Sequence, residues 1–197
     1  MKCANSASPA FVLIRCIFNS RFFIPFSVWG NVFVEISRKN GNLVASLRIF
    51  EEHCKIALVE KLEYMKPDLA ACNAALEGCC RGLESVNDTE NVIKTMLILG
   101  VRPDELSFGF LAYLYALKGL KEKIKELEDF LSGFGFLNKK TFYNNLISCY
   151  VKSGNLESVS ATILQSLKGG GEDRNFSEET YCEVVNGFFF RKEISRD

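Results

Sequence analysis

The chain has 197 residues, of which 48% are hydrophobic and 24% are charged, and its 24 basic residues balance its 24 acidic ones. This composition is typical of a soluble globular protein with one sizeable core. A net charge of zero excludes the broad basic footprint with which strong, nonspecific nucleic-acid binders neutralise phosphates. Any contact with nucleic acid is therefore expected to be local and specific, or weak.

The first 34 residues contain no Asp or Glu, and they carry Lys2, Arg15 and Arg21 among Ser, Ala and Phe. Such a composition resembles an organelle transit peptide. Residues 11–33 form an apolar run that Arg15, Asn19 and Arg21 interrupt. The run therefore contains no uncharged span of about 18 residues that could cross a bilayer. We expect residues 1–27 to form a transit peptide. A disordered segment is the alternative, and a secretory signal is a weaker interpretation because no uncharged core precedes a small-residue cleavage site.

A degenerate first repeat is expected at residues 28–68. Apolar residues recur every three or four positions between Leu43 and Leu62, which predicts a helix there. The weaker candidate for its partner helix is Val28–Lys39. The only histidine of the chain, His53, is expected at the surface or edge of the predicted helix.

A repeat of about 36 residues organises the rest of the chain. The sequence Lys66–Asp68 (KPD) returns 36 residues later as Arg102–Asp104 (RPD). Asn73, Gly109 and Asn144 then occupy equivalent places, 36 and 35 residues apart. This period is typical of stacked helical pairs, because one pair cannot bury its apolar face alone. The predicted fold is all-α, a right-handed α-solenoid of stacked antiparallel helix pairs.

The solenoid is expected to occupy residues 69–197, with repeats at 69–104, 105–139 and 140–177 and a partial repeat at 178–197. In the first of these, helices are predicted at Ala70–Arg81 and Asn87–Leu99. Gly100 follows as a C-terminal stop. Glycines also interrupt the later pairs at Gly119 and Gly154. Period-two alternation of apolar residues is rare, so strands are not expected.

The residues show no pattern of an enzyme, a metal site or a cofactor site. A zinc deaminase needs His-x-Glu with Cys-x-x-Cys, and neither pattern occurs. The eight cysteines lie mostly in apolar helical stripes, where Cys acts as a small hydrophobe, and free thiols in this number favour a reducing compartment. The alternating Lys and Glu residues of Lys118–Asp129 predict a solvated helix face with salt-bridge pairs.

Several segments resemble one known family. Thr141–Leu156 (TFYNNLISCYVKSGNL) resembles the opening of a pentatricopeptide repeat, and Cys72–Cys80 matches the same opening. Gly100–Asp104 (GVRPD) resembles the end of such a repeat. The resemblance covers roughly residues 66–190, and 28–65 with less agreement. It implies sequence-selective binding of single-stranded RNA in plant organelles, with one base read per repeat on the concave face.

In this family, two positions carry most of the base selection: a polar residue early in the first helix and the last residue of the repeat. The pairs implied here are Asn73 with Asp104, Gly109 with Lys139, and Asn144 with Ser177. By the family pattern the first pair favours uridine and the third leans to cytidine, while Gly109 has no side chain to read a base. An aliphatic residue near the helix start clamps the base; Leu106 fits this role and Thr141 fits it poorly.

Helix capping is an alternative role for the polar residues of these repeats. Asn73 and Asn144 are of a residue type that caps helices well, whereas their regular spacing raises the base-reading interpretation to an equal alternative. Asp68 and Asp104 precede predicted helices and are equally plausible caps.

The main functional hypothesis is a non-catalytic protein that binds single-stranded organelle RNA and acts in RNA processing, stability or editing. It is expected in the mitochondrion, with the chloroplast as the alternative, as a monomer without a membrane segment and with other RNA-processing proteins as further partners. A second hypothesis is a protein-binding helical scaffold, favoured by the neutral charge and by Gly109. A third is an incomplete product of a longer repeat protein.

Overall fold

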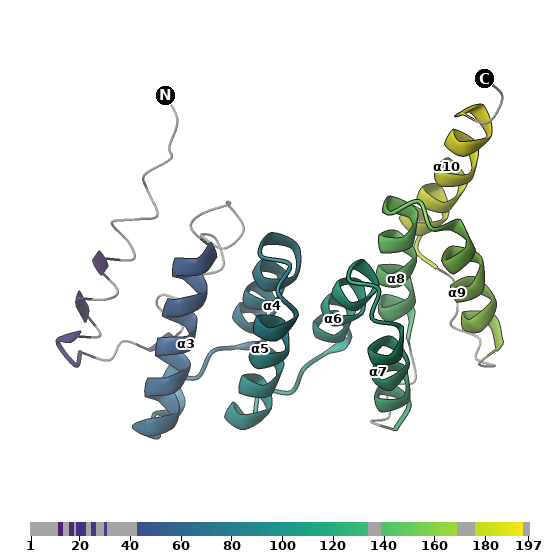
Figure 1. Cartoon of the computed structure of the whole chain (residues 1–197). Coiled ribbons are helices and arrows are strands. Elements are labelled where there is room, and N and C mark those ends of the chain that lie inside the picture. Colours follow the sequence, from purple (N-terminus) through teal and green to yellow (C-terminus); the bar gives the residue numbers. More distant parts are fainter. Residues whose placement is uncertain are drawn as a thin grey trace, which may run out of the picture. The chain divides into compact units, whose positions relative to one another are not determined.

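The computed structural model describes residues 12, 13, 16, 17, 19–22, 25, 26, 30, 43–133, 139–168 and 176–194. Two compact units divide the chain: Met1–Pro103, the N-terminal unit, and Asp104–Asp197, the C-terminal unit. The regular elements of the described residues are all helical (Figure 1). Most of the predicted transit peptide and of the predicted helix at Val28–Lys39 lies outside the described residues.

Three α-helices build the described part of the N-terminal unit: α3 (Leu43–Val59), α4 (Leu69–Glu77) and α5 (Val86–Leu99). A 3-10 turn at Glu63–Met65 follows α3, and a π-helical turn at Gly78–Gly82 continues α4 without a break. Helix α4 packs against both α3 and α5. Together, α4 and its π-helical turn cover the predicted first helix of this repeat, and α5 begins one residue before the predicted second helix.

Side chains at the helix starts and one glycine set these boundaries. The Asp68 side chain accepts a hydrogen bond from the Ala71 backbone N–H at 2.9 Å, which satisfies one of the free donors at the start of α4. Ser85 caps α5 in the same way, accepting from the Asp88 N–H at 3.3 Å. Gly100 ends α5 in the left-handed conformation, with φ of 75°. The predicted cap at Asp68 and the predicted stop at Gly100 are therefore confirmed.

The core of the N-terminal unit is apolar but contains the single histidine. Its buried residues include Ile49, Phe50, Cys54, Ala57, Met65, Cys72, Leu76, Met96 and Leu99. His53 is fully buried, and its Nε2 lies 2.5 Å from the Met65 carbonyl oxygen. Burial lowers the His53 pKa to about 4, although the hydrogen bond to that carbonyl acts in the opposite direction, so the ring is neutral at pH 7. The expectation of a surface or edge histidine is wrong.

Five helices build the described part of the C-terminal unit: α6 (Glu105–Leu117), α7 (Lys121–Gly133), α8 (Lys140–Lys152), α9 (Leu156–Lys168) and α10 (Glu178–Ile194). The first helices of the repeats, α6, α8 and α10, contact one another in chain order. Helix α7 packs on α6, and α9 packs on α8 (Figure 1). This arrangement of stacked helical pairs is the one that the repeat period predicts.

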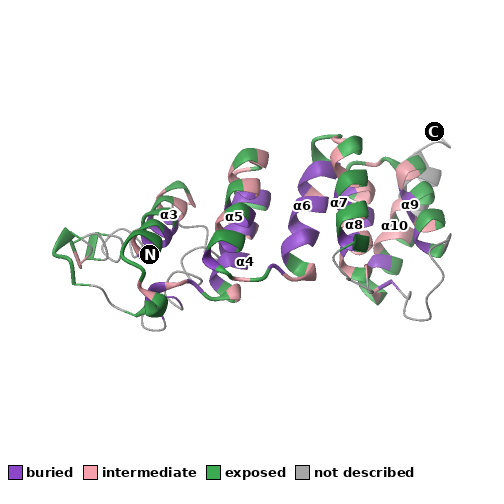
Figure 2. Cartoon of the chain, turned by 90° about the horizontal axis from the view of Figure 1, so that it is seen from below, coloured by how far each residue is buried: buried purple, intermediate pink, exposed green. Residues whose placement is uncertain are grey.

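The two helices of the pair α6–α7 differ strongly in burial (Figure 2). Most of α6 is buried, including Phe108 and Leu114, because the helix carries apolar residues on nearly all sides. In α7 the buried residues are Leu127 and Leu131, which form a narrow stripe on an otherwise charged helix. The turn between the helices contains Gly119 at φ of 67°, a left-handed conformation that glycine adopts without steric cost.

Candidate nucleic-acid interface

Asn73 is a buried residue of the N-terminal unit. It is the fifth residue of α4, lies between buried Cys72 and Ala74, and is 9% exposed. The side chain that caps α4 is Asp68 rather than Asn73, so the capping interpretation of Asn73 is wrong. Its predicted partner in base reading, Asp104, belongs to the C-terminal unit.

Asp104 caps α6 through a reciprocal arrangement with Ser107. Asp104 Oδ1 accepts hydrogen bonds from the Ser107 backbone N–H and hydroxyl, both at 2.9 Å. The Asp104 N–H in turn donates to Ser107 Oγ at 3.2 Å, which completes a capping box. The predicted cap role is confirmed. These two side-chain bonds use one of the two carboxylate oxygens.

Leu106 and Gly109 lie in the first turns of α6 but in opposite surroundings. Leu106 is 44% exposed, so its aliphatic surface is accessible. Gly109 is buried, and a Cβ atom added to it would lie 2.7 Å from Asn145 Nδ2 and 3.2 Å from Thr141 Cγ2. Helix α8 therefore approaches the backbone of α6 closely at Gly109, as an absent side chain permits.

Thr141 joins the first turn of α8 to that of α6. Its hydroxyl donates to Glu105 Oε2 at 3.3 Å, and its carbonyl accepts from Asn145 Nδ2 at 2.9 Å. Its methyl group faces Gly109. Thr141 thus contacts α6 through its hydroxyl and its methyl group, while its carbonyl bonds within α8, in keeping with its poor fit to an aliphatic clamp.

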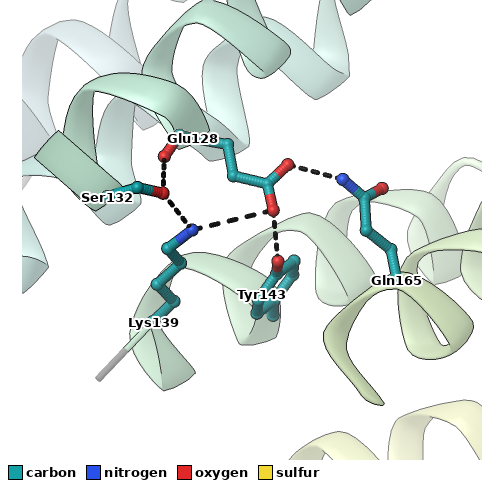
Figure 3. A network of polar contacts seen from close by, with 5 residues as sticks. All are labelled: Glu128, Ser132, Lys139, Tyr143 and Gln165. Carbon is teal, nitrogen blue, oxygen red and sulfur yellow. Dashed lines mark hydrogen bonds and ion pairs between the residues drawn. The ribbon is translucent and has the colours of Figure 1, made fainter. Parts of the chain in front are cut away.

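Lys139, just before α8, is engaged with α7 in a polar network (Figure 3). Its Nζ lies 2.6 Å from Ser132 Oγ and 3.9 Å from Glu128 Oε1. Glu128 also accepts a short hydrogen bond from the Tyr143 hydroxyl of α8 and one of 2.5 Å from Gln165 Nε2 of α9. One carboxylate therefore joins α7, α8 and α9.

The burial of Glu128 was not expected from the sequence. Its side chain is 15% exposed and that of Lys139 is 23% exposed. The interpretation of this residue as part of a solvated, salt-bridged face is wrong, because its side-chain partners lie just before α8, on α8 and on α9, 11 to 37 residues away. Among the alternating charged residues of α7, Glu128 is the one acid that these contacts place against the neighbouring repeat. No local sequence pattern distinguishes Glu128 from the other acidic residues of the helix.

Asn144 and Ser177, the third predicted pair, both lie in the C-terminal unit. Asn144 is the fifth residue of α8 and is half-buried, so it is not a helix cap. Its Oδ1 is buried and has no hydrogen-bond partner among the described residues. Ser177 precedes α10, where its Oγ accepts from the Thr180 N–H at 3.2 Å and lies 2.8 Å from the Thr180 hydroxyl. Helices α8 and α10 pack together, but no described hydrogen bond joins Asn144 to Ser177.

An unpartnered buried acceptor is uncommon, because its desolvation costs about 1–3 kcal/mol. Asn144 Oδ1 is such an acceptor, on a residue that the family resemblance predicts to select a base. This oxygen has almost no solvent-exposed surface, so a donor from outside the protein can reach it only after the side chain turns outward.

The cysteines offer no sign of metal or redox chemistry in the described part of the chain. Burial raises the pKa of Cys72 and of Cys79 to about 12, so these thiols are protonated and inert at pH 7. No described group of three or more His, Cys, Asp or Glu residues could hold a metal ion. Among the described residues, no helix is both long and apolar enough to cross a membrane.

The fold and the repeat-spaced polar residues define a class, the helical-repeat proteins. The crystal structure of the pentatricopeptide repeat protein PPR10 from maize is similar to 90% of this chain and 24% of that one, with a TM-score of 0.59. At 19% identity this match is a likeness of fold. It agrees with the predicted all-α fold of stacked helices. A family model described as "At1g68980, TPR repeats" matches residues 1–66.

Two proteins of Arabidopsis thaliana match nearly the whole chain in sequence. Pentatricopeptide repeat-containing protein At1g69290 is 58% identical over 98% of this chain and 30% of its own length. Pentatricopeptide repeat-containing protein At1g68980, mitochondrial, is 57% identical over 98% of this chain and 31% of its own length. The chain thus spans about 30% of the length of these curated relatives. It belongs to the pentatricopeptide repeat family.

Proposed function

We propose that this chain binds single-stranded RNA without catalysing a reaction, as a factor in the processing, stability or editing of organelle RNA. Bases bind along the first helices of successive repeats. The pair Asn73 and Asp104 selects uridine, and the pair Asn144 and Ser177 selects cytidine. Leu106 offers an exposed aliphatic surface to a base, in keeping with a clamp role. Thr141, Gly109 and Lys139 hold the remaining positions of the predicted interface.

The observation that carries this proposal is the state of Asn144. Its repeat-equivalent position supports a role in which the half-buried side chain turns outward and its amide pairs with an RNA base, which also satisfies the oxygen that has no described partner in the free protein. The buried thiols are protonated and the buried histidine is neutral, so this proposal gives neither kind of side chain a catalytic role. Pentatricopeptide repeat proteins are generally non-catalytic, which agrees with this proposal.

The mitochondrion is the proposed location. Two relatives carry "mitochondrial" in their names: At1g68980, at 57% identity, and At1g03100, at 26% identity over 87% of this chain. The acid-free composition of the first 34 residues supports import into an organelle.

Titration with short RNAs tests the base-reading role of Asn144. Fluorescently labelled oligonucleotides that differ at one position are bound to the full chain and to Asn144→Ala. Loss of one amide contact is expected to weaken binding of the preferred pyrimidine by about 1–3 kcal/mol and to leave the other bases nearly unaffected. Asn91→Ala, an exposed Asn on the second helix α5, is the matched control. An equal loss for all four bases would refute selection by Asn144.

A protein-binding scaffold is the second candidate function, because apolar side chains are exposed on second helices. Leu164 and Leu167 of α9 are 59% and 58% exposed. Capture of partners from plant mitochondrial extract, with and without nuclease, separates the two functions. Partners that survive nuclease treatment, together with no measurable binding of RNA, would favour the scaffold.

A further inference from the structure

The middle repeat, Glu105–Lys139, differs from its neighbours at the position that selects a base. Asn73 and Asn144 hold the equivalent places in the flanking repeats, whereas this repeat has Gly109. The space beside Gly109 is filled, since an added Cβ would lie 2.7 Å from Asn145 Nδ2. A side chain of the next repeat therefore occupies the volume that a reading side chain would need.

Local hydrogen bonds hold the Asn145 amide in this place. Its Nδ2 donates to the Thr141 carbonyl at 2.9 Å, one turn earlier on α8. Thr141 is itself bonded to Glu105 of α6 at 3.3 Å and places its methyl group 3.2 Å from the added Cβ. Moving Asn145 away from Gly109 would break the first of these bonds, so the filled position is a stable feature of the contact between α6 and α8.

The second selecting position of the repeat, Lys139, is also engaged. Its ammonium group contacts Ser132 Oγ at 2.6 Å and Glu128 Oε1 at 3.9 Å. Glu128 is 15% exposed, so withdrawal of Lys139 toward a base would remove a positive charge from beside a largely buried carboxylate. Such a change is unfavourable, because a buried charge is stabilised by its partners.

We propose that Asn145 closes the base-selecting position of the repeat Glu105–Lys139, so that this repeat accepts any base. The proposal rests on the proposed binding of RNA. It makes Asn145 a residue that determines specificity by exclusion, and it assigns Lys139 to the packing of α7 against α8. The protein then reads two pyrimidines separated by one unread nucleotide.

Equilibrium binding measurements on the full chain test this assignment. The probes are fluorescein-labelled 12-nucleotide RNAs with a U-N-C or a C-N-U core in an adenosine background, where N is each of the four bases. Both core orders are used so that the direction of the RNA need not be assumed. For the order that binds, the four bases at N are expected to give affinities within about twofold of one another, a small difference on the scale of one hydrogen-bonded contact.

A double variant provides the positive test. Gly109→Asn combined with Asn145→Ala replaces the closing side chain by a small one and supplies an amide at the selecting position. This variant is expected to gain a preference of about fivefold or more for a pyrimidine at N, at the lower limit of one base contact. Asn145→Ala alone is the matched control, and it is expected to remain indifferent at N.

Three results would count against the proposal. A preference at N in the wild-type chain that Asn145→Ala abolishes would make Asn145 a reader. A double variant that stays indifferent while still binding RNA would show that Asn145 does not set this property. Failure of the wild-type chain to bind any probe would overturn the RNA-binding function itself, a result distinct from the other two.

Thermal unfolding tests the packing independently of RNA. Alanine is a better helix former than glycine, so Gly109→Ala is expected to raise the melting temperature once Asn145 has been shortened to Ala. In the wild-type background the new methyl group meets the Asn145 amide, and the gain is expected to be smaller or reversed. Equal shifts in the two backgrounds would contradict the filled position at Gly109.

Discussion

The two units of this protein build similar helical pairs with different interiors. The N-terminal unit buries thiols and a neutral histidine in an apolar core, whereas the C-terminal unit places a carboxylate, an ammonium group and amides between its helices. The difference indicates that helical pairs of the same repeat length can pack through apolar burial or through polar contacts.

In the N-terminal unit, burial favours the neutral forms of the titratable side chains. It raises the pKa of the Cys54 thiol above its ordinary range and that of Cys72 to about 12, and it lowers the pKa of His53 to about 4. Each of these groups is consequently neutral at pH 7, which is the form that a low-dielectric interior favours.

In the C-terminal unit, polar groups connect the repeats. Glu128 joins three helices, Thr141 bonds to Glu105, and Asn145 fills the space beside Gly109. Hydrogen bonds depend on direction, so they fix how one pair of helices sits on the next more tightly than apolar contact alone. The positions proposed to read RNA therefore depend on these contacts in this unit.

The largest expected effects come from the apolar residues that both units share. Phe50→Ala in α3 and Phe142→Ala in α8 remove rings that are 1% and 2% exposed. Each is expected to lower the free energy of unfolding by about 3–5 kcal/mol, through lost burial and the cavity left behind. Urea unfolding followed by circular dichroism measures both. Phe130→Ala, at 43% exposure, is the control and should cost far less.

If only one of the two buried phenylalanines proves costly, the units differ in their apolar packing as well as in their polar groups. That result would contradict the expectation that both units depend equally on their buried aromatic rings.

Acidification is expected to weaken the N-terminal unit through His53. Its folded-state pKa of about 4 lies below the ordinary 6.5, so the unfolded chain binds more protons between these values. The stabilising contribution is complete above pH 6.5 and is lost as the pH falls toward 4. From pH 7 to pH 5 the loss is about 2 kcal/mol, measured by denaturant unfolding at each pH.

The matched variant is His53→Gln, which retains a polar group able to reach the Met65 carbonyl but does not titrate in this range. Its stability should vary much less between pH 7 and pH 5. The same pH dependence in wild type and variant would show that the histidine is not responsible.

A smaller effect is expected from Glu128→Gln in the C-terminal unit. The neutral amide has one acceptor oxygen for the Tyr143 and Gln165 donors and loses the charge that pairs with Lys139. The free energy of unfolding is expected to fall by about 1–3 kcal/mol.

Glu126→Gln changes an exposed acid two residues earlier on the same helix and should alter stability by no more than about 0.5 kcal/mol. If the two variants behave alike, the Glu128 network does not stabilise the C-terminal unit.

Much of the fold could be predicted from the sequence because its signals are local. The repeat period, the apolar stripes and stops such as Gly100 lie within one helix or turn, and α5 was predicted to within one residue. The π-helical turn after α4 could not be predicted, because no residue pattern in Gly78–Gly82 distinguishes it from an α-helix.

The candidate site was predictable only in outline. Repeat spacing points to Asn144, and the absence of a side chain marks Gly109 as unusual. The burial of His53, the partners of Glu128 and the position of Asn145 depend on contacts with residues on other elements. Such contacts produce no periodic pattern in a single amino-acid sequence.

Sequencing of RNA crosslinked to the full chain in plant mitochondrial extract tests the central claim most directly. The account predicts crosslinked RNAs enriched in a uridine and a cytidine separated by one nucleotide. The variant Asn73→Ala/Asn144→Ala should still crosslink but should lose that enrichment. Recovery of no RNA above background, or of the same motif from the variant, would contradict the account.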